Sequence, residues 1–444
     1  MGAPTRFAPF LRHTRGLDAR VMLSNELPHD LRFRPVSEMG LRELERLRLI
    51  LRGSSVIDWR RLHFKSRDEV DRFLKLCELD LSRPHDEAWI RTILADAVEY
   101  LRRTFKYRVN AAVAQPREIH DLFLYASDAA GPGRHRRIAC IVLKVMHVLQ
   151  HIEARDLLFR LPVSEEDISE LLTTKVVSVA AEMRDRGVPV AEFSDSMKTR
   201  ESLITKLIAK RDTVAAQVYD RTRFRIITHS REDLLPVLYH LTQSLFPFNF
   251  VVPGQSENTL VPFRGVLDEH PHLKRFVDEL HLDLGYEDRE REGSSNVFSG
   301  DSYRALNFVV DVPLRMDDFL PAPESDHRPR KGRIVFGQCE FQIMDAETAR
   351  LNEHGENSHD RYKRRQRVQV LRRLARGLIV PRPPPSELTG APVDVAPAQA
   401  PEGAPSEVLN EAGVPGGPGR ESASGGLDGG PAPDPGTKTP PKVD

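Results

Sequence analysis

The stretch GQCEFQIM at residues 337–344 decides the fold class, because its polar and apolar side chains alternate. In an extended strand, successive side chains point to opposite faces. Glu340 and Gln342 therefore share one face, and Cys339 and Phe341 share the other. The alternation predicts a strand that packs on helices with one face and offers the other to a polar ligand or to solvent.

A second stretch, YRALNFVVDV at residues 303–312, alternates in the same way and places Tyr303 and Asn307 on one face. Residues 223–228 and 248–252 also have the composition of strands. Helical patterns lie between and around these strands, at residues 165–185, 198–216, 232–245 and 346–376. Together they predict an α/β (α+β) domain with a mixed β-sheet flanked by helices.

The N-terminal part of the chain has the pattern of helices. In residues 87–105 apolar side chains recur every three or four positions, which builds one buried stripe. Residues 41–51 and 138–158 repeat this pattern. We therefore expect a helical N-terminal domain over residues 1–165, followed by the α/β domain over residues 166–380.

The C-terminal segment, residues 381–444, has a different composition. It holds 15 prolines and 11 glycines in 64 residues and no Phe, Tyr or Trp. Such a segment buries too little apolar surface to offset the entropy lost on ordering. We expect a disordered tail.

Charge and cysteine content narrow the class of protein. The 65 basic and 65 acidic residues give a net charge of zero, so the overall electrostatic field does not indicate a basic or an acidic partner. Three widely spaced cysteines without a C-x-x-C pair argue against a disulfide framework or a zinc knuckle and favour a reducing cytoplasm. No apolar run reaches the roughly 18 residues that span a bilayer, so no membrane segment is expected. Residues 361–376 carry eight Arg or Lys and no acid, which makes RNA a candidate partner.

Four short segments with chemically active side chains follow one another along the α/β part. They are KTRES at 198–202 with Lys206, DRTRFRII at 220–227, SYRALNFVV at 302–310, and EFQI at 340–343 followed by HDRYK at 359–363. Their order resembles the synthetase domain of RelA/SpoT-type (p)ppGpp synthetases, with its motifs K-x-x-x-S…K, D-x-x-x-x-R-I, G-Y-R-S-L-H and E-x-Q-I-R before a histidine and Y-K. The resemblance covers about residues 190–370 and implies a nucleotidyltransferase-like fold.

The resemblance also implies a reaction, the Mg²⁺-dependent transfer of pyrophosphate from ATP to the 3′-hydroxyl of GDP or GTP, as in the stringent response. In such a transfer the protein positions groups and neutralises charge. By the resemblance, Asp220 and Glu340 are the catalytic residues and the Mg²⁺ ligands, and Glu340 also orients or deprotonates the attacking hydroxyl. The resemblance implies nucleotide binding by Lys198, Ser202, Lys206, Arg225, Tyr303, Asn307, Gln342, His359 and Lys363. Among these, the lysines near residue 200 and Arg225 hold phosphates, and Tyr303 stacks on guanine.

Three departures from the family pattern lead to a second hypothesis. Ser196 stands where the family has an arginine that contacts ATP, and Ser302 stands where it has a glycine. Asn307 replaces the histidine of G-Y-R-S-L-H, and an asparagine cannot carry a proton at neutral pH. The alternative to an active synthetase is therefore a catalytically weakened, nucleotide- or RNA-binding regulatory protein on the same fold.

The hydrolase of the HD type that often precedes this synthetase is not expected here. His120-Asp121 occurs, but no acidic pair follows it and no suitably placed histidine precedes it. The sequence leaves the acceptor nucleotide, the signal sensed and the oligomeric state open.

Overall fold

The computed structural model describes residues 32–53, 63–127, 129–209, 221–270, 272–273, 303–321, 332–353 and 359–375. The chain divides into two compact units, Met1–Val380 and Pro381–Asp444, and all described residues lie in the first. The disordered tail expected over residues 381–444 lies outside the described residues and stays a prediction. The expected domain boundary at residue 165 also stays a prediction.

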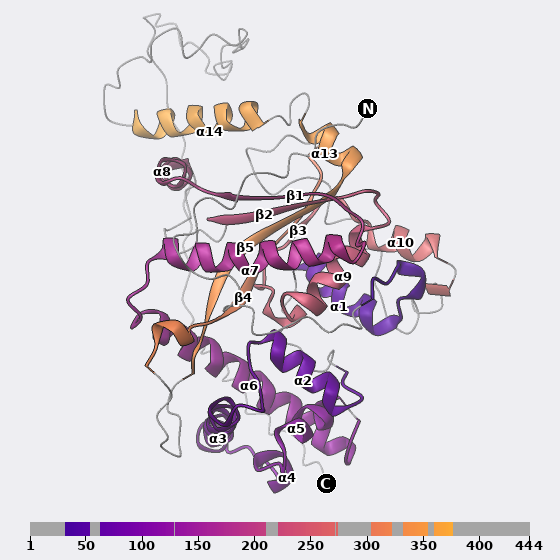
Figure 1. Cartoon of the computed structure of the whole chain (residues 1–444), viewed down its shortest axis with the longest axis vertical. Coiled ribbons are helices and arrows are strands. Elements are labelled where there is room, and N and C mark those ends of the chain that lie inside the picture. Colours follow the sequence, from indigo (N-terminus) through magenta and orange to yellow (C-terminus); the bar gives the residue numbers. More distant parts are fainter. Residues whose placement is uncertain are drawn as a thin grey trace, which may run out of the picture. The chain divides into compact units, whose positions relative to one another are not determined.

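A five-stranded mixed sheet forms the centre of the described part (Figure 1). Its strands are β1 (Val190–Met197), β2 (Thr222–Thr228), β3 (Glu257–Asn258), β4 (Leu306–Arg315) and β5 (Ile334–Asp345). They lie in the order β1-β2-β5-β4-β3, with β2 and β5 parallel and the other neighbours antiparallel. The predicted α/β class, a mixed sheet flanked by helices, is confirmed.

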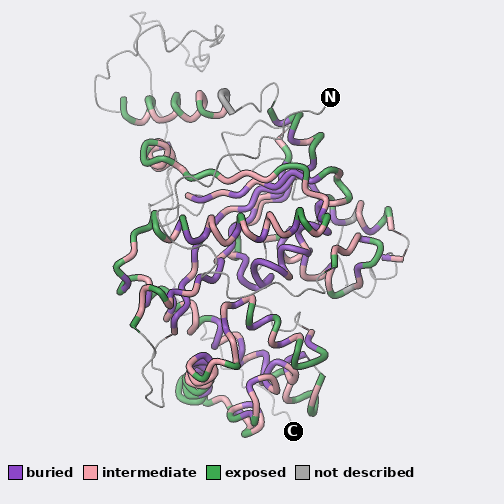
Figure 2. The backbone as a smooth tube through the Cα atoms, viewed as in Figure 1, coloured by how far each residue is buried: buried purple, intermediate pink, exposed green. Residues whose placement is uncertain are grey.

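One face of the sheet is packed with aromatic side chains. Phe224 on β2 and Phe341 on β5 are fully buried, and their ring centroids lie 5.4 Å apart. Phe246, just after α9 (Leu234–Ser244), places its ring 5.7 Å from that of Phe341. Helix α7 (Glu165–Asp185) also packs along this face, and Figure 2 shows β2, β4 and β5 as largely buried, whereas β1 at the sheet edge has no buried residue.

Within the described residues six α-helices precede α7, in agreement with the predicted helical N-terminal part. They are α1 (Leu41–Arg52), α2 (Arg67–Leu76), α3 (Pro84–Phe105), α4 (Ala111–Ala114), α5 (Ile119–Ala126) and α6 (Gly133–Leu158). Helix α1 ends at Gly53, whose φ of +64° favours a residue without a Cβ. Helix α7 begins with a capping box, in which Ser164 and Asp167 bond each other's backbone N–H groups.

Charged side chains fasten the start of α3 to the far ends of β4 and β5. Arg315 pairs with Asp86 of α3 and with Asp317, and Arg333 also bonds Asp317. The side chains of Arg315 and Asp86 are only 11% and 5% exposed. Burial alone would raise the pKa of Asp317, but the bonds and charges of the two arginines lower it overall. This cluster therefore has a structural role in joining helices to the sheet.

Two sequence-based predictions are wrong. The strand expected at 248–252 is the 3-10 turn η4 (Phe248–Phe250), and only Val251 makes a bridge to β4. Pro247 fixes the chain direction there, and its carbonyl accepts the N–H of Phe250 at 2.9 Å, which closes the turn.

The long basic helix expected over residues 346–376 is two helices, α13 (Ala346–Glu353) and α14 (His359–Leu374), on either side of the undescribed residues 354–358. The remaining described elements are η1 (Val36–Glu38), α8 (Arg200–Ala209), α10 (Phe263–Glu269) and η5 (Asp317–Phe319). None of the helices within the described ranges combines the length and apolar character that a bilayer span requires.

Candidate functional site

The candidate site lies on the polar face of the sheet, where β2, β5 and β4 run side by side. Strand register places Arg223 opposite Glu340 and Arg225 opposite Gln342. On the other side of β5, Asn307 of β4 also lies opposite Gln342. Because directly opposed residues project to the same face, the predicted residues Arg225, Asn307, Glu340 and Gln342 share one surface.

An amide at the centre of this face joins two other predicted residues. The Nε2 atom of Gln342 donates to the hydroxyl oxygen of Tyr303 at 2.7 Å and to Oδ1 of Asn307 at 3.2 Å. Burial raises the pKa of Tyr303, and the nearby charges of Arg223 and Glu340 act on it in opposite directions. The tyrosine is therefore held in place at the edge of a charged group of side chains.

Glu340 forms an ion pair within the same face. Nε and Nη2 of Arg223 lie 2.8 and 2.7 Å from Oε2 of Glu340. The Glu340 side chain is 13% exposed and that of Arg223 is 34% exposed. Both contacts use one carboxylate oxygen, and no donor among the described residues bonds Oε1. That second oxygen is available to accept a proton or to contact a ligand.

The predicted Mg²⁺ site is described only in part. A carboxylate oxygen of Glu340 is the kind of ligand that Mg²⁺ prefers. Asp220, the second predicted ligand, lies outside the described residues, which contain no cluster of three acidic, histidine or cysteine side chains suited to a metal. The described residues thus do not make up a metal site by themselves, and the metal stays a prediction.

Helix α13 supports the tyrosine and one arginine of the face. The side chain of Asn352 donates to the carbonyl of Arg304 at 2.7 Å and accepts the N–H of Arg304 at 3.2 Å. This pair of bonds fixes the backbone next to Tyr303. Glu353 of α13 lies 3.4 Å from Nη1 of Arg225, a contact between partly exposed side chains. Arg225 remains half-exposed on the polar face.

The other predicted nucleotide-binding residues lie outside the strands. Lys198 follows β1 directly, and its backbone N–H donates to the carbonyl of Arg221 at 2.9 Å. Ser202 and Lys206 are on α8, His359 and Lys363 are on α14, and the His359 side chain is not described. The two helices pack on each other, with Arg373 donating to the carbonyl of Ile208 at 2.5 Å. RNA binding by the basic residues of α14 stays a prediction.

Two residues of the polar face were missed by the sequence reasoning. Arg223 lies two positions before Arg225, so the alternation used for the other strands could have identified it. Glu257 on the two-residue strand β3 lies opposite Asn307, and so short a strand has no readable pattern. Ser196 on β1 lies opposite Arg223, so a guanidinium is next to the serine that departs from the family pattern.

Comparisons with known proteins give structural neighbours only. No protein-family model matches the chain, and no curated protein matches it. Small alarmone synthetase 2 from Bacillus subtilis is 12% identical, and the match covers 48% of this chain and 97% of that chain with a TM-score of 0.25. Small alarmone synthetase 1 from Bacillus subtilis, bound to its product pppGpp, is 14% identical, and the match covers 47% of this chain and 88% of that chain with a TM-score of 0.24. A GTP pyrophosphokinase family protein from Streptococcus pneumoniae is 13% identical, and the match covers 47% of this chain and 84% of that chain with a TM-score of 0.25. Similarities this low carry no inference about the activity of the chain.

Proposed function

We propose that the polar face of the sheet binds nucleotides and transfers pyrophosphate from ATP to the 3′-hydroxyl of GDP or GTP. One observation carries the proposal: residues from three separate sequence motifs, among them Arg225, Asn307, Glu340 and Gln342, lie together on one face of β2, β5 and β4. A solvated sheet face has no need of this combination of guanidinium, amide and carboxylate groups at one place.

Each group has a role in the proposed transfer. Arg225, which is half-exposed, would neutralise phosphate charge, which grows in the transition state. The ring of Tyr303, fixed by its hydrogen bond to Gln342, would stack on the guanine base. Oε1 of Glu340 would accept the proton of the attacking hydroxyl or orient it. Mg²⁺, held by Glu340 and Asp220 in this proposal, supplies positive charge at the phosphates when it is bound.

Arg223 could replace the ATP-contacting arginine that is absent at Ser196. Its position opposite Ser196 places a planar guanidinium on the same face, one strand away. An arginine at either position of such a pair can reach a phosphate above the sheet, because its side chain is long and donates up to five hydrogen bonds. In this role the guanidinium of Arg223 would contact ATP beside its ion pair with Glu340.

A second candidate function is supported by the same ion pair. Oε2 of Glu340 is occupied by two donors of Arg223, so it must release the guanidinium before it binds a metal. Asn307 uses its oxygen for Gln342 and cannot act as an acid or base at neutral pH. Both features favour a protein that binds a nucleotide on this face and turns it over slowly or not at all.

One assay separates the two functions. The full chain is incubated with labelled ATP, Mg²⁺ and, in parallel, GDP, GTP, ADP or tRNA as acceptor, and nucleotide binding is measured by calorimetry on the same protein. The first function predicts a labelled guanosine product, its loss in Glu340→Gln, and almost unchanged binding in that variant. Binding without any product in the wild type would support the second function. If no nucleotide binds at millimolar concentration, both assignments of this face are wrong.

A further inference from the structure

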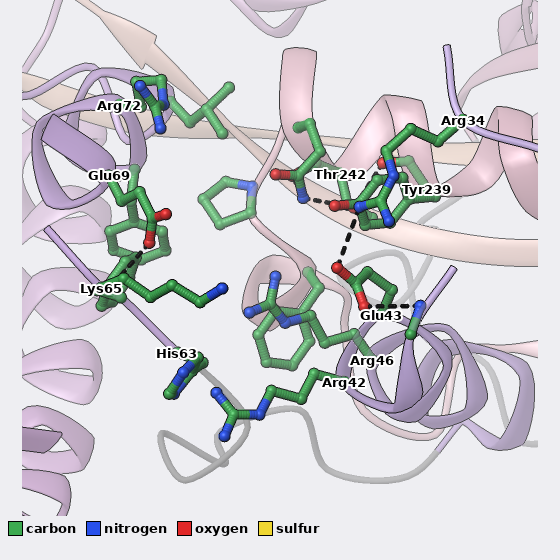
Figure 3. Close-up of a pocket in the computed structure, with 17 residues that line it drawn as sticks. Arg34, Arg42, Glu43, Arg46, His63, Lys65, Glu69, Arg72, Tyr239 and Thr242 are labelled. Carbon is green, nitrogen blue, oxygen red and sulfur yellow. Dashed lines mark hydrogen bonds and ion pairs between the residues drawn. The ribbon is translucent and has the colours of Figure 1, made fainter. Parts of the chain in front are cut away.

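A cavity of about 740 Å³ lies between α1, α2 and α9, away from the polar face of the sheet (Figure 3). None of the residues assigned to the candidate site lines it. Any ligand of this cavity is therefore distinct from a nucleotide on the polar face.

The wall of the cavity is strongly basic. Five arginine or lysine side chains and two glutamates line it: Arg34, Arg42, Arg46, Lys65, Arg72, Glu43 and Glu69. The carboxylate of Glu43 is occupied by Nη1 of Arg34 at 3.1 Å and by the N–H of Gly40 at 3.1 Å. Glu69 accepts the backbone N–H of Lys65 at 2.7 Å. The two acids therefore balance at most two of the five positive charges that line the wall.

Three of the cations face the open space. Figure 3 shows the ends of Arg42 and Arg46 from α1 and of Lys65, which precedes α2, directed into the gap between these helices. Within the described residues, the side chains of Arg42, Lys65 and Arg72 make no hydrogen bond or ion pair, and all three are exposed. Cations gathered in this way repel one another, and an anion between them removes that repulsion.

Arg46 differs from Arg42, Lys65 and Arg72 because its surroundings cover part of its side chain. Its guanidinium lies 5.8 Å from the ring centre of Phe248, which also lines the cavity. Burial lowers the pKa of Arg46, which means that its surroundings disfavour the charged form. A bound anion would oppose this effect by supplying the opposite charge next to the guanidinium.

The size and lining of the cavity define the class of ligand. Its volume lies within the range of about 300–1,000 Å³ typical of small-molecule sites and is too small to enclose a folded macromolecule. The faces of Tyr239 and Phe248 are already used by Arg34 and Arg46, each 5.8 Å from the ring centre, so they do not offer a free platform for a base. Arginines bind phosphate oxygens in pairs, with strong charge-assisted hydrogen bonds. We propose that this cavity binds a small ligand through a di- or triphosphate group.

The proposal is tested with inorganic tripolyphosphate, titrated calorimetrically into the full chain. We expect binding that weakens as salt is added, and weaker binding of inorganic phosphate, because one phosphate reaches only part of the cationic wall. The double variant Arg42→Ala/Lys65→Ala should bind tripolyphosphate about tenfold or more weakly, since each lost cation removes a charge-assisted contact. Both side chains are exposed, so their loss should leave the fold intact. Arg137→Ala on α6, an exposed arginine away from the cavity, is the matched control and should bind as the wild type does.

ATP distinguishes a nucleotide from a free polyphosphate as the source of the phosphates. Stronger binding of ATP than of tripolyphosphate, lost in the double variant, would identify a nucleotide ligand; equal binding would identify the phosphates alone as the recognised group. The proposal is overturned if tripolyphosphate does not bind at millimolar concentration, or if the double variant binds it as tightly as the wild type. Loss of binding in Arg225→Ala but not in the double variant would assign the triphosphate to the sheet and also overturn it.

Discussion

Two halves of the same sheet face carry polar side chains for different reasons. In the half covered by α6, His151 stacks on Phe336 with ring centroids 4.2 Å apart and places Nε2 3.4 Å from Asp311. Gln338 donates to the same Asp311 at 2.8 Å. The His151–Asp311 contact fastens α6 to the sheet, while Gln338 is exposed and bonds across to β4. In the half that carries the candidate site, Gln342 bonds Asn307 on β4 and Tyr303, which precedes that strand.

The comparison teaches that a polar sheet face is not by itself a binding site. Where α6 covers the face, Asp311 has a partner on that helix, and this contact contributes to stability. Where Tyr303, Asn307, Glu340 and Gln342 gather, the bonds stay within a single surface, and Oε1 of Glu340 has no donor among the described residues. Substitutions should therefore change stability in the first half and ligand binding in the second.

The largest expected effect is in the buried ion pair at the far end of β4. Arg315→Ala leaves Asp86 as a buried charge without its main partner, which costs about 3–5 kcal/mol of the free energy of unfolding. Arg225→Ala should cost less than about 1 kcal/mol, because its pair with Glu353 is 27% and 63% exposed. Urea unfolding of both variants measures the difference. An equal loss of unfolding free energy in the two variants would contradict a structural role for Arg315 and a ligand-binding role for Arg225.

The second effect is a dependence of stability on pH that arises from His147 on α6, the helix that covers one half of the polar face. Burial, and then the adjacent His151, lowers the pKa of His147 to about 3. Between the unfolded value of about 6.5 and this value, the unfolded chain binds more protons, so stability falls as the pH drops. We expect a loss on the order of 1–2 kcal/mol between pH 7 and pH 5, and a smaller loss in His147→Gln. Urea unfolding at the two pH values measures it. His229→Gln, an exposed histidine, is the control and should keep the wild-type slope.

The third effect is on ligand binding rather than stability. Tyr303→Ala should weaken guanine-nucleotide binding about tenfold, since stacking on a base contributes about 1–3 kcal/mol. Tyr303→Phe keeps the ring and loses only the hydrogen bond from Gln342, so its effect should be a fraction of that. Calorimetry with GDP measures both variants. A weak effect of the alanine variant together with a strong effect of the phenylalanine variant would rule out stacking as the role of Tyr303.

The sequence predicted those parts of the fold and site that depend on local pattern. Alternation correctly placed Asn307, Glu340 and Gln342 on one face, and helical periodicity located α1, α3, α6, α7 and α9. The same rule applied to residues 223–225 would have added Arg223. It failed at residues 248–252, where Pro247 and the packing of two phenylalanines produce a turn.

Tertiary contacts decided the features that no local pattern contains. Strand β1 was missed because its residues, VAEFSDSM, mix polar and apolar types without a clear period. Glu257 joins the face only through its register with Asn307. The basic cavity forms because α1, α2 and α9 come together, and the sequence does not show that helices far apart along the chain share a wall.

The central claim is that the Gln342 half of the face binds a nucleotide and the Gln338 half does not. Gln342→Ala and Gln338→Ala test it most directly, because the two glutamines lie four residues apart on the same strand and face. Calorimetric titration with GDP and with ATP should show weaker binding by roughly three- to tenfold in Gln342→Ala, which loses the bonds that position Tyr303 and Asn307. Gln338→Ala should bind as the wild type does. Equal affinities in the two variants, or a larger loss in Gln338→Ala, would contradict the assignment of the site.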